Sequence, residues 1–221
     1  MTTLLIRLSG PMQSWGTADS RFATFRDTAR EPSKSGVVGL IAAALGYPRA
    51  ATVDDVAALR MGVRVDQPGE MLCDFQAIQD ALVASGKKRR NAISYRWYLS
   101  DARFLVGLEG ERGFLAHIQW ALNNPVWLLY LGRKKFVPGE PLALGDGLRD
   151  QPLLEALAGH PWLGIDERRR PETVRVVYQV HRGEGDQRRD QPRGTIEERR
   201  FAPRWVTAID IPTPGSSKED E

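Results

Sequence analysis

The order in which strand-like and helix-like segments alternate along the chain constrains its fold most. Residues 3–8 alternate apolar side chains on one face, as a strand does, and residues 35–45 form an apolar segment between Pro32 and Gly46, as a helix does. The same criteria predict four more segments, which are strands at 61–66 and 126–131, an extended stretch at 93–108 and a helix at 114–123. This succession of strand, helix, strand, strand, helix and strand is the ferredoxin-like, split βαβ order, and it predicts an α+β fold.

A basic hairpin is expected in the middle of this order. A strand at 71–78 leads to the turn residues Ser85 and Gly86, and strand-like residues follow the turn. Four consecutive cations lie at the tip, and they are Lys87, Lys88, Arg89 and Arg90. The sequence therefore predicts a protruding β-hairpin at about residues 78–97.

The composition changes after residue 138, where prolines and glycines become frequent. Residues 1–138 are therefore expected to form the ferredoxin-like domain that contains the hairpin. Beyond it we expect a small C-terminal β-rich lobe at 139–211, a disordered tail at 212–221 and, because charged residues dominate it, a mobile loop at 182–200. Within the lobe, the pattern predicts a helix at 153–158 and strands at 173–180 and 204–211.

The composition indicates a globular protein of the cell interior. The chain has 221 residues, a net charge of +3 and 42% hydrophobic residues. No apolar run approaches the ~18 residues of a membrane span, and the chain starts as an amphipathic strand, not as a signal sequence. The lone Cys73 can form neither an internal disulfide nor a metal cluster. We therefore expect a cytoplasmic protein without a membrane partner, metal or cofactor.

Arginine dominates the basic residues, with 25 arginines against 6 lysines, and its planar fork suits phosphates and base edges. Arg133, Lys134 and Lys135 follow directly from the strand expected at 126–131, so these cations should emerge at a fixed sheet edge. Basic side chains interleaved with rings can pair with phosphates while the rings stack on bases. Such a run follows the hairpin cations, and it is Tyr95, Arg96, Trp97 and Tyr98. Three further arginine clusters alternate with acidic residues and are expected to be self-neutralised surface, at 168–170, 188–189 and 199–200.

A polar loop and the helix start that follows it also fit RNA. Gln13, Ser14 and Trp15 supply an amide, a hydroxyl and an aromatic ring. Lys34 and Ser35 lie where the helix begins, and the first N–H groups of a helix lack intrahelical partners. Single-stranded RNA is bound by such groups. Two roles stay open for Trp15, which can either stack on a base or plug the edge of a core.

The sequence offers few catalytic groups. His117, His160 and His181 have no metal-ligand spacing, and no zinc-protease, phosphate-loop or nucleophile-elbow motif occurs. The chain is therefore expected not to be an enzyme. Two alternatives remain open, namely a metal-independent endoribonuclease that combines His117 with tyrosine or lysine partners, and a domain that binds a small phosphorylated ligand.

Four collinear segments of the first 138 residues resemble the repeat-associated RNA-binding family of CRISPR-associated proteins, and within it the subunits of type I-E Cascade complexes. The segments are residues 8–16, 32–40, 98–104 and 131–134. The resemblance implies an RRM-related fold with a hairpin thumb. It also implies a role in antiviral defence, in which the subunit caps the 5′ handle of the CRISPR guide RNA beside the backbone subunit and the large subunit. The subunit would be non-catalytic, since another subunit cuts the precursor, whereas in a related subtype the family member is itself the endoribonuclease. A contact with target DNA stays open.

The resemblance also implies where the RNA lies. It places a set of residues near one edge of the sheet, namely Gln13, Ser14, Trp15, Lys34, Ser35, Arg133 and Lys134. Charge alone adds Arg96, Lys135 and the four hairpin cations to this set. An aromatic RNP run is missing from the sequence, so recognition is expected from loops and the thumb more than from an open sheet face.

Overall fold

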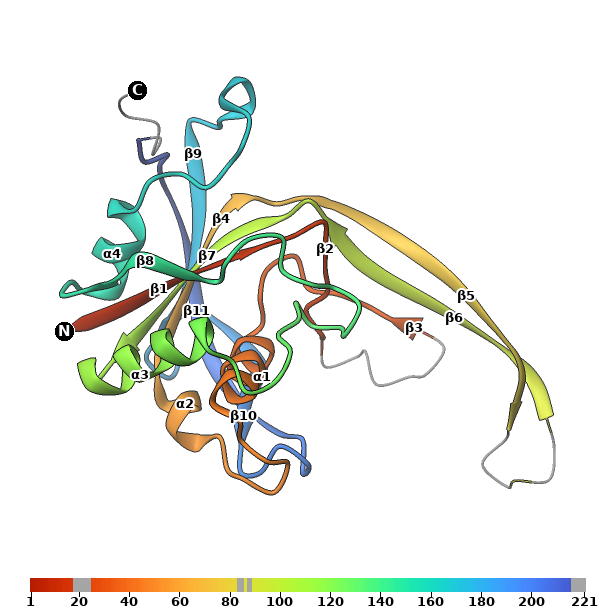
Figure 1. Ribbon diagram of the computed structural model, residues 1–221. Helices are drawn as coiled ribbons and strands as arrows, with labels where there is room; N and C mark the ends of the chain where they lie inside the picture. Colours follow the sequence, from red (N-terminus) through yellow and green to blue (C-terminus); the bar gives the residue numbers. More distant parts are fainter. Residues whose placement is uncertain (18–24, 83–85, 87–88, 216–221) are drawn as a thin grey trace.

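A seven-stranded antiparallel sheet forms the centre of the molecule. The computed structural model describes residues 1–17, 25–82, 86 and 89–215 (Figure 1). The strand order is β10-β11-β9-β4-β7-β1-β8. The bounds of these strands are β1 Thr2–Ser9, β4 Arg60–Gln67, β7 Arg103–Gly110, β8 Ala143–Arg149, β9 Thr173–Val180, β10 Asp186–Arg193 and β11 Arg200–Pro212.

Helices cover both faces of this sheet. The helices α1 (Lys34–Leu45), α2 (Asp54–Ala58) and α3 (Arg112–Asn123) lie on one face, and α4 (Leu153–Gly159) lies on the other, followed by a short 3-10 helix, Glu167–Arg169. Alternate residues of β1 serve the two cores. Leu4, Ile6 and Leu8 pack in the core beneath α1 and α3, whereas Leu5 packs against α4. Burial on both sides explains the run of three consecutive apolar residues, Leu4, Leu5 and Ile6, in this strand.

The expected order of elements is confirmed up to α3 and differs after it. β7 lies between β1 and β4, and β1 lies between β7 and β8, so each helical connection spans an intervening strand. The strand predicted at 126–131 is wrong, because this segment is irregular and β8 occupies the sheet position beside β1. Residues 126 and 127 instead donate backbone hydrogen bonds to Ala44 and Ala43, the last carbonyls of α1. An apolar run can donate backbone hydrogen bonds to the carbonyls at the end of a helix as readily as it can form a strand of a sheet.

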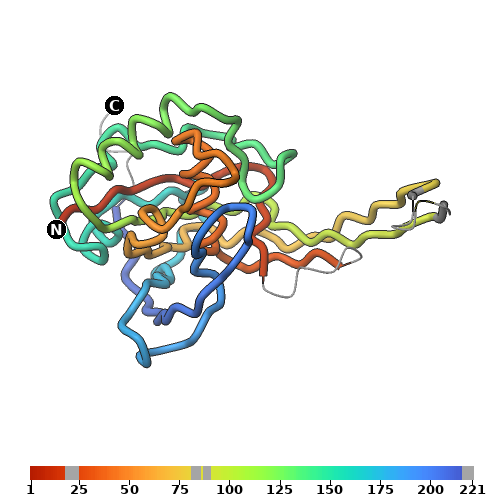
Figure 2. The backbone as a smooth tube through the Cα atoms, turned by 90° about the horizontal axis from the view of Figure 1, so that it is seen from below, coloured from red at the N-terminus to blue at the C-terminus, as the bar shows by residue number. Residues whose placement is uncertain are grey.

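A long hairpin projects from the body in both ribbon and tube views (Figures 1 and 2). It consists of β5 (Glu70–Leu82) and β6 (Arg89–Ser100), and β6 also pairs with β2 (Met12–Gln13) and β3 (Phe25–Arg26). The hairpin is therefore longer than predicted. The extended stretch expected at 93–108 is two strands, because the chain turns at Asp101, whose φ is +55°.

The C-terminal strands extend the central sheet across the boundary expected at residue 138. β9 pairs with β4, β11 pairs with β9, and β10 pairs with β11 (Figure 1). The mobile loop predicted at 182–200 is wrong, since it contains β10, an edge strand that has too few apolar residues to show a strand pattern. Of the expected tail, Thr213 and Gly215 make backbone hydrogen bonds, and residues 216–221 lie outside the described residues.

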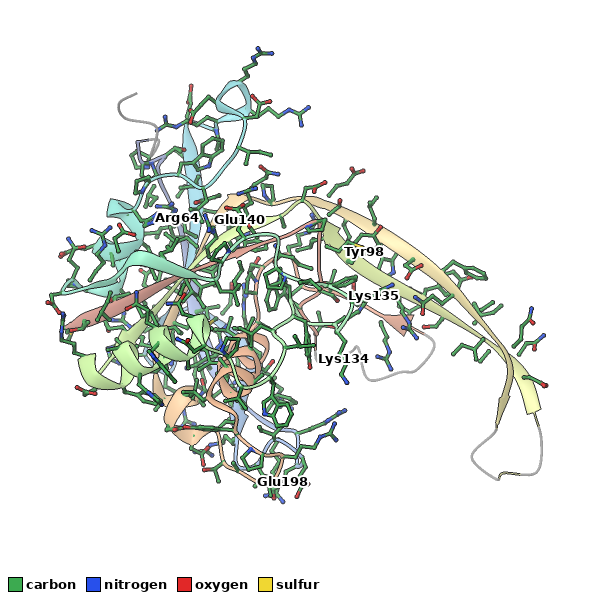
Figure 3. All side chains as sticks on the ribbon, in the orientation of Figure 1. Arg64, Tyr98, Lys134, Lys135, Glu140 and Glu198 are labelled. Atoms are coloured by element: carbon green, nitrogen blue, oxygen red, sulfur yellow. The ribbon has the colours of Figure 1, made fainter. Side chains whose placement is uncertain are left out.

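A buried ion pair fixes α4 to the sheet. Arg64 of β4 is fully buried, and its guanidinium contacts both carboxylate oxygens of Asp66, at 2.6 and 2.8 Å. The same guanidinium donates to the backbone oxygens of His160 and Pro161, just after α4 (Figure 3). Every charge in this cluster therefore has a partner.

Among the described residues, no helix is both long and apolar enough to cross a membrane.

Candidate nucleic-acid interface

Gln13, predicted to contact RNA, has a side chain that is used inside the fold. Its side chain is completely buried, and its amide nitrogen donates to the backbone oxygens of Leu8, at 3.1 Å, and Ala102, at 2.7 Å. Its amide oxygen accepts a hydrogen bond from the indole nitrogen of Trp15 at 3.2 Å. The amide joins β1, the start of β7 and the following loop, and it is not exposed to a ligand.

Trp15 plugs the core, which is the second of its two predicted roles, and its ring has no exposed face on which a base could stack. The ring has no exposed surface, and its backbone pairs with residues 28 and 29. It lies directly against Gly36 of α1, where a Cβ atom would come within 2.8 Å of the ring atom Cε3. Glycine at this position lets the helix approach the indole ring, and the ring in turn sets the height of α1 above the sheet.

Two N–H groups in the first turn of α1, those of Lys34 and Gly36, already have partners within the protein. Ser33 caps the helix by accepting from the N–H of Gly36, and the N–H of Lys34 donates to a carboxylate oxygen of Asp190 at 2.8 Å. The Lys34 ammonium is buried and donates to Gln179 at 2.9 Å. Burial and the nearby Arg204 lower the pKa of Lys34 to about 7, although Asp190 opposes that shift. The Lys34 ammonium and these N–H groups, which were predicted to contact RNA, therefore donate to groups of the protein itself.

A groove of about 750 Å³ opens beside this helix start. Ser14 and Ser35 line it, so these two predicted residues do come together at one surface, although Ser14 itself is largely buried. Its walls come from the loop after β2, from α1 and from the strands β10 and β11. Among the described residues that line it are five arginines and one acid, and they are Arg26, Arg189, Arg193, Arg199, Arg200 and Asp190.

Most of these arginines were missed in the sequence, because the clusters at 188–189 and 199–200 were interpreted as neutralised surface. Half of that interpretation is confirmed, since Arg188 pairs with Glu31 at 2.6 Å and Arg200 with Glu198 at 3.3 Å. Within the described part of the chain, Arg189, Arg193 and Arg199 take part in no ion pair. Only the recognition of an edge strand at 186–193 would have indicated that Arg189 and Arg193 face one groove.

A second group of cations lies where the hairpin leaves the body. The guanidinium of Arg133 donates to the backbone oxygens of Trp97, at 2.8 Å, and Arg26, at 3.3 Å. Burial lowers the pKa of Arg133, and so do the positive charges of Arg96 and Arg26. Arg133 is therefore close enough to Arg96 and to Arg26 to be repelled by both. Arg26 belongs both to this group and to the groove, so the two positive surfaces are continuous.

Two lysines of the same turn differ in their availability. Lys135 pairs with Asp74 of the hairpin at 2.7 Å, and this contact lowers the pKa of the Asp74 carboxyl. Lys134 is exposed and lies beside the hairpin root (Figure 3). These cations emerge from a turn, because no strand precedes them, and the turn is fixed where the Ser14 N–H donates to Leu131. Gly132, with a φ of +87°, is required there because a Cβ atom would overlap the Ser14 carbonyl.

The interleaving of rings and cations in β6 is separated in space. Alternate residues of a strand face opposite ways, so Tyr95 and Trp97 share one face while Arg96 and Tyr98 share the other. Exposed rings gather on the first face, where Tyr95 contacts Phe25 and Phe75 at centroid distances of 6.0 and 5.5 Å. At the tip, Lys87 and Lys88 lie outside the described residues, as do the side chains of Arg89 and Arg90.

No catalytic constellation is assembled among the described residues. His117 is exposed on α3, where its ring stacks on Trp120 at 6.1 Å. His160 is buried after α4, and its pKa is lowered mainly by burial. In the part of the chain that the structure describes, no group of three or more histidine, cysteine or acidic side chains could hold a metal ion.

Comparison with known proteins agrees with the resemblance carried by the four segments. A family model described as CRISPR-associated protein (Cas_Cas5) matches residues 3–208. The chain belongs to the Cas5 family. The Cascade subunit CasD of Escherichia coli (strain K12) is 31% identical over 163 residues, which are 64% of this chain and 70% of that protein.

Solved structures extend the likeness of this Cas5 protein to nearly its whole length. A crystal structure of a Cas protein is 48% identical, with a TM-score of 0.80, and the match covers 97% of this chain and 98% of the other. A chain of a CRISPR RNA-guided surveillance complex is 31% identical, with a TM-score of 0.78, over 98% of this chain and 95% of the other. The Cas5 fold thus includes the C-terminal strands that line the groove.

Proposed function

We propose that this Cas5 protein is the subunit of a CRISPR Cascade surveillance complex that holds the 5′ handle of the guide RNA without cutting it. The observation that carries the proposal is the groove beside α1, in which Arg189, Arg193 and Arg199 have no acidic partner in the described part of the chain. Arginine forks bind phosphate oxygens in two-point contacts, so this groove suits an RNA backbone. The relatives CasD and the chain of the surveillance complex support the same role.

The sheet itself is an unsuitable platform for RNA, which supports recognition through the groove and hairpin root. The strand order β4-β7-β1-β8, with α1 and α3 on one face, favours a ferredoxin-like, RRM-related core. In ordinary RRM proteins, bases stack on an open face of that sheet. Here α4 covers the opposite face over β1, β4 and β7. The RNA is therefore proposed to run from the groove past Arg26 to the cations at Arg133 and Lys134.

Partners follow from the same proposal. A surface that grips RNA phosphates at one edge leaves the other faces available for neighbouring subunits, for which we propose the backbone subunit and the large subunit of Cascade. The cations at the hairpin root are also accessible to a second polyanion, such as target DNA. The hairpin, which projects away from the body, is suited to contact such neighbours (Figure 2).

A binding and cleavage assay on one labelled CRISPR repeat RNA, with and without its 5′ handle and in the presence of EDTA, tests the proposal. Handle-dependent binding with intact RNA is expected. Cleavage at one position would overturn the non-catalytic role, and His117→Ala would then be tested for loss of the cut. Competition by a mononucleotide, with indifference to RNA length, would overturn RNA binding in favour of a small phosphorylated ligand.

Paired substitutions locate the RNA on the surface. The double variant Arg189→Gln/Arg193→Gln should reduce the slope of log affinity against log salt by about 0.7 for each lost phosphate contact on single-stranded RNA. A matched control is Arg168→Gln/Arg169→Gln, which removes the same charge from the self-neutralised 3-10 helix. An equal change of slope in both variants would show that net charge, not the groove, governs binding.

A further inference from the structure

The strand that carries two groove arginines is held by a single ladder and by a few side chains. Arg188 pairs with Glu31 at 2.6 Å, and the amide nitrogen of Gln191 donates to the backbone oxygen of Ala57 at 2.6 Å. β10 is the edge strand of the sheet and pairs with β11 alone. The pairing is interrupted where the groove residues lie, because the register shifts between Arg188 and Gln191. Such a bulge leaves residues outside the ladder and re-aims their side chains. Arg189 and Asp190 are the two residues inside this interruption.

Asp190 adds the contacts made from inside the interruption of the ladder. Its carboxylate accepts from the guanidinium of Arg204 on β11, at 2.6 and 2.9 Å, and from the backbone N–H of Lys34 in the first turn of α1, at 2.8 Å. Arg204 is almost fully buried, so this is a fixed pair, not a surface contact. One side chain thus joins the edge strand, its neighbouring strand and the helix that forms the opposite wall of the groove.

The position of Asp190 has an electrostatic cost for RNA binding. It is the one acid among the described residues that line the groove, and a carboxylate near bound phosphates repels them. Its attachment to the start of α1 also occupies a helix end that would otherwise favour an anion. A residue that served binding by charge alone would not be acidic here. Its contacts therefore suggest a role in placing other groups.

We infer that Asp190 is a positioning residue for RNA, which holds the bulged part of β10 against α1 and thereby places Arg189 and Arg193 in the groove. This inference rests on the proposed function, because it assumes that RNA occupies the groove. It differs from a general structural role in that its effect on RNA must pass through the two arginines.

The sign of one substitution separates the two effects of Asp190. Asp190→Asn keeps the shape and an acceptor for the Lys34 N–H but loses the charged pair with Arg204. Charge alone predicts tighter binding of handle RNA by this variant, whereas positioning predicts weaker binding, by about five- to tenfold for the displacement of one or two charge-assisted contacts. Asp186→Asn is the matched control, since it removes an exposed acid from the same strand and should leave affinity unchanged or slightly higher.

A double-mutant cycle then tests the route of the effect. Asp190→Asn should weaken RNA binding in the wild-type background and have little or no effect in the Arg189→Gln/Arg193→Gln background, because coupled residues are non-additive. Tighter binding by Asp190→Asn, or an equal loss in both backgrounds, would overturn the inference. Absence of handle binding by the wild-type protein would instead overturn the proposed function.

A second variant keeps the inference testable if Asp190→Asn does not fold. Thermal unfolding of each variant is recorded first, and if Asp190→Asn does not fold, Arg204→Lys replaces it in the same cycle. Lysine keeps the positive charge but cannot make the two-point contact with Asp190. The same loss of affinity, again dependent on the two arginines, is expected from Arg204→Lys. Unchanged affinity in a folded Arg204→Lys protein would count against positioning by Asp190.

Discussion

Replacing Trp15 by phenylalanine separates a packing role from an RNA contact. The indole is completely buried, donates to the amide oxygen of Gln13 and packs against Gly36. Phenylalanine keeps an aromatic ring that could still stack on a base. It removes part of the buried ring, however, and also the N–H that satisfies Gln13. Stability should therefore fall while RNA affinity stays the same.

The magnitude follows from these two losses. The smaller ring gives up about three buried heavy atoms, which at ~0.8 kcal/mol per methylene-sized group is about 2 kcal/mol. The unpaired amide oxygen of Gln13 adds about 1–3 kcal/mol, since a buried acceptor without a donor carries its desolvation cost. The sum is roughly 3–5 kcal/mol. For a chain of this size that corresponds to a fall in Tm of roughly 6–20 °C, at about 2–4 °C per kcal/mol.

Two measurements on the same protein check this prediction, namely thermal unfolding and titration with labelled handle RNA. Trp127→Phe is the matched control, because that ring is 58% exposed and its replacement should change stability by about 0.5 kcal/mol or less. The reasoning is refuted if Trp15→Phe leaves Tm unchanged and weakens RNA binding several-fold. That result would mean that the ring reaches the RNA.

Three further predictions concern stability. Lys34 has a pKa of about 7 in the folded protein and 10.5 in the unfolded chain, so the unfolded state binds more protons between these values, and the free energy of unfolding should rise by about 2 kcal/mol from pH 7 to pH 9. Urea unfolding should show this rise in the wild-type protein and not in Lys34→Met, and an equal rise in both would refute the prediction. Arg64→Leu leaves Asp66 buried without its partner and should lower the free energy of unfolding by about 3–5 kcal/mol in the same assay. Adding Asp66→Asn to this variant should restore part of the loss, whereas a loss below about 1 kcal/mol would contradict the buried pair. Gly132→Ala places a side chain at a φ of +87° and against a backbone carbonyl, so it should lower the free energy of unfolding by more than the ~1–2 kcal/mol of a left-handed residue. Gly159→Ala meets open space and should be tolerated, and equal Tm values for the two variants would exclude the close approach at Gly132.

The sequence predicts those elements in which burial produces a regular pattern of apolar residues. β1, β4 and α3 are predicted by the spacing of their apolar side chains, and α1 by an apolar segment bounded by Pro32 and Gly46. The segment 126–131 shows the limit of this criterion, since an apolar run is compatible with a strand, a buried turn or the cover of a helix end. β10 shows the opposite limit, because an edge strand that buries little looks like a charged loop.

Site residues are harder to predict, because a polar group can be satisfied by the protein or by a ligand. Gln13 and Lys34 have the chemistry of RNA contacts, but their donors are used inside the fold. Arg189 and Arg193 have the same chemistry and line the groove. Composition and spacing cannot separate these cases. The difference lies in which residues face one another across the sheet and α1, and that is a property of the tertiary structure.

The residue types of the motif around Trp15 and of the helix start around Gly36 indicate direct contacts with RNA. In the structure, these two segments instead hold other elements of the fold in place. Trp15 fixes α1 above the sheet, and Asp190 attaches the arginine-bearing strand to the first turn of that helix. Substitutions in the motif should act first on stability, and substitutions of Arg189 or Arg193 first on the salt dependence of RNA binding. If RNA binding by this Cas5 protein were instead insensitive to salt, base contacts would have to supply the affinity, and the arginine groove would not be the site.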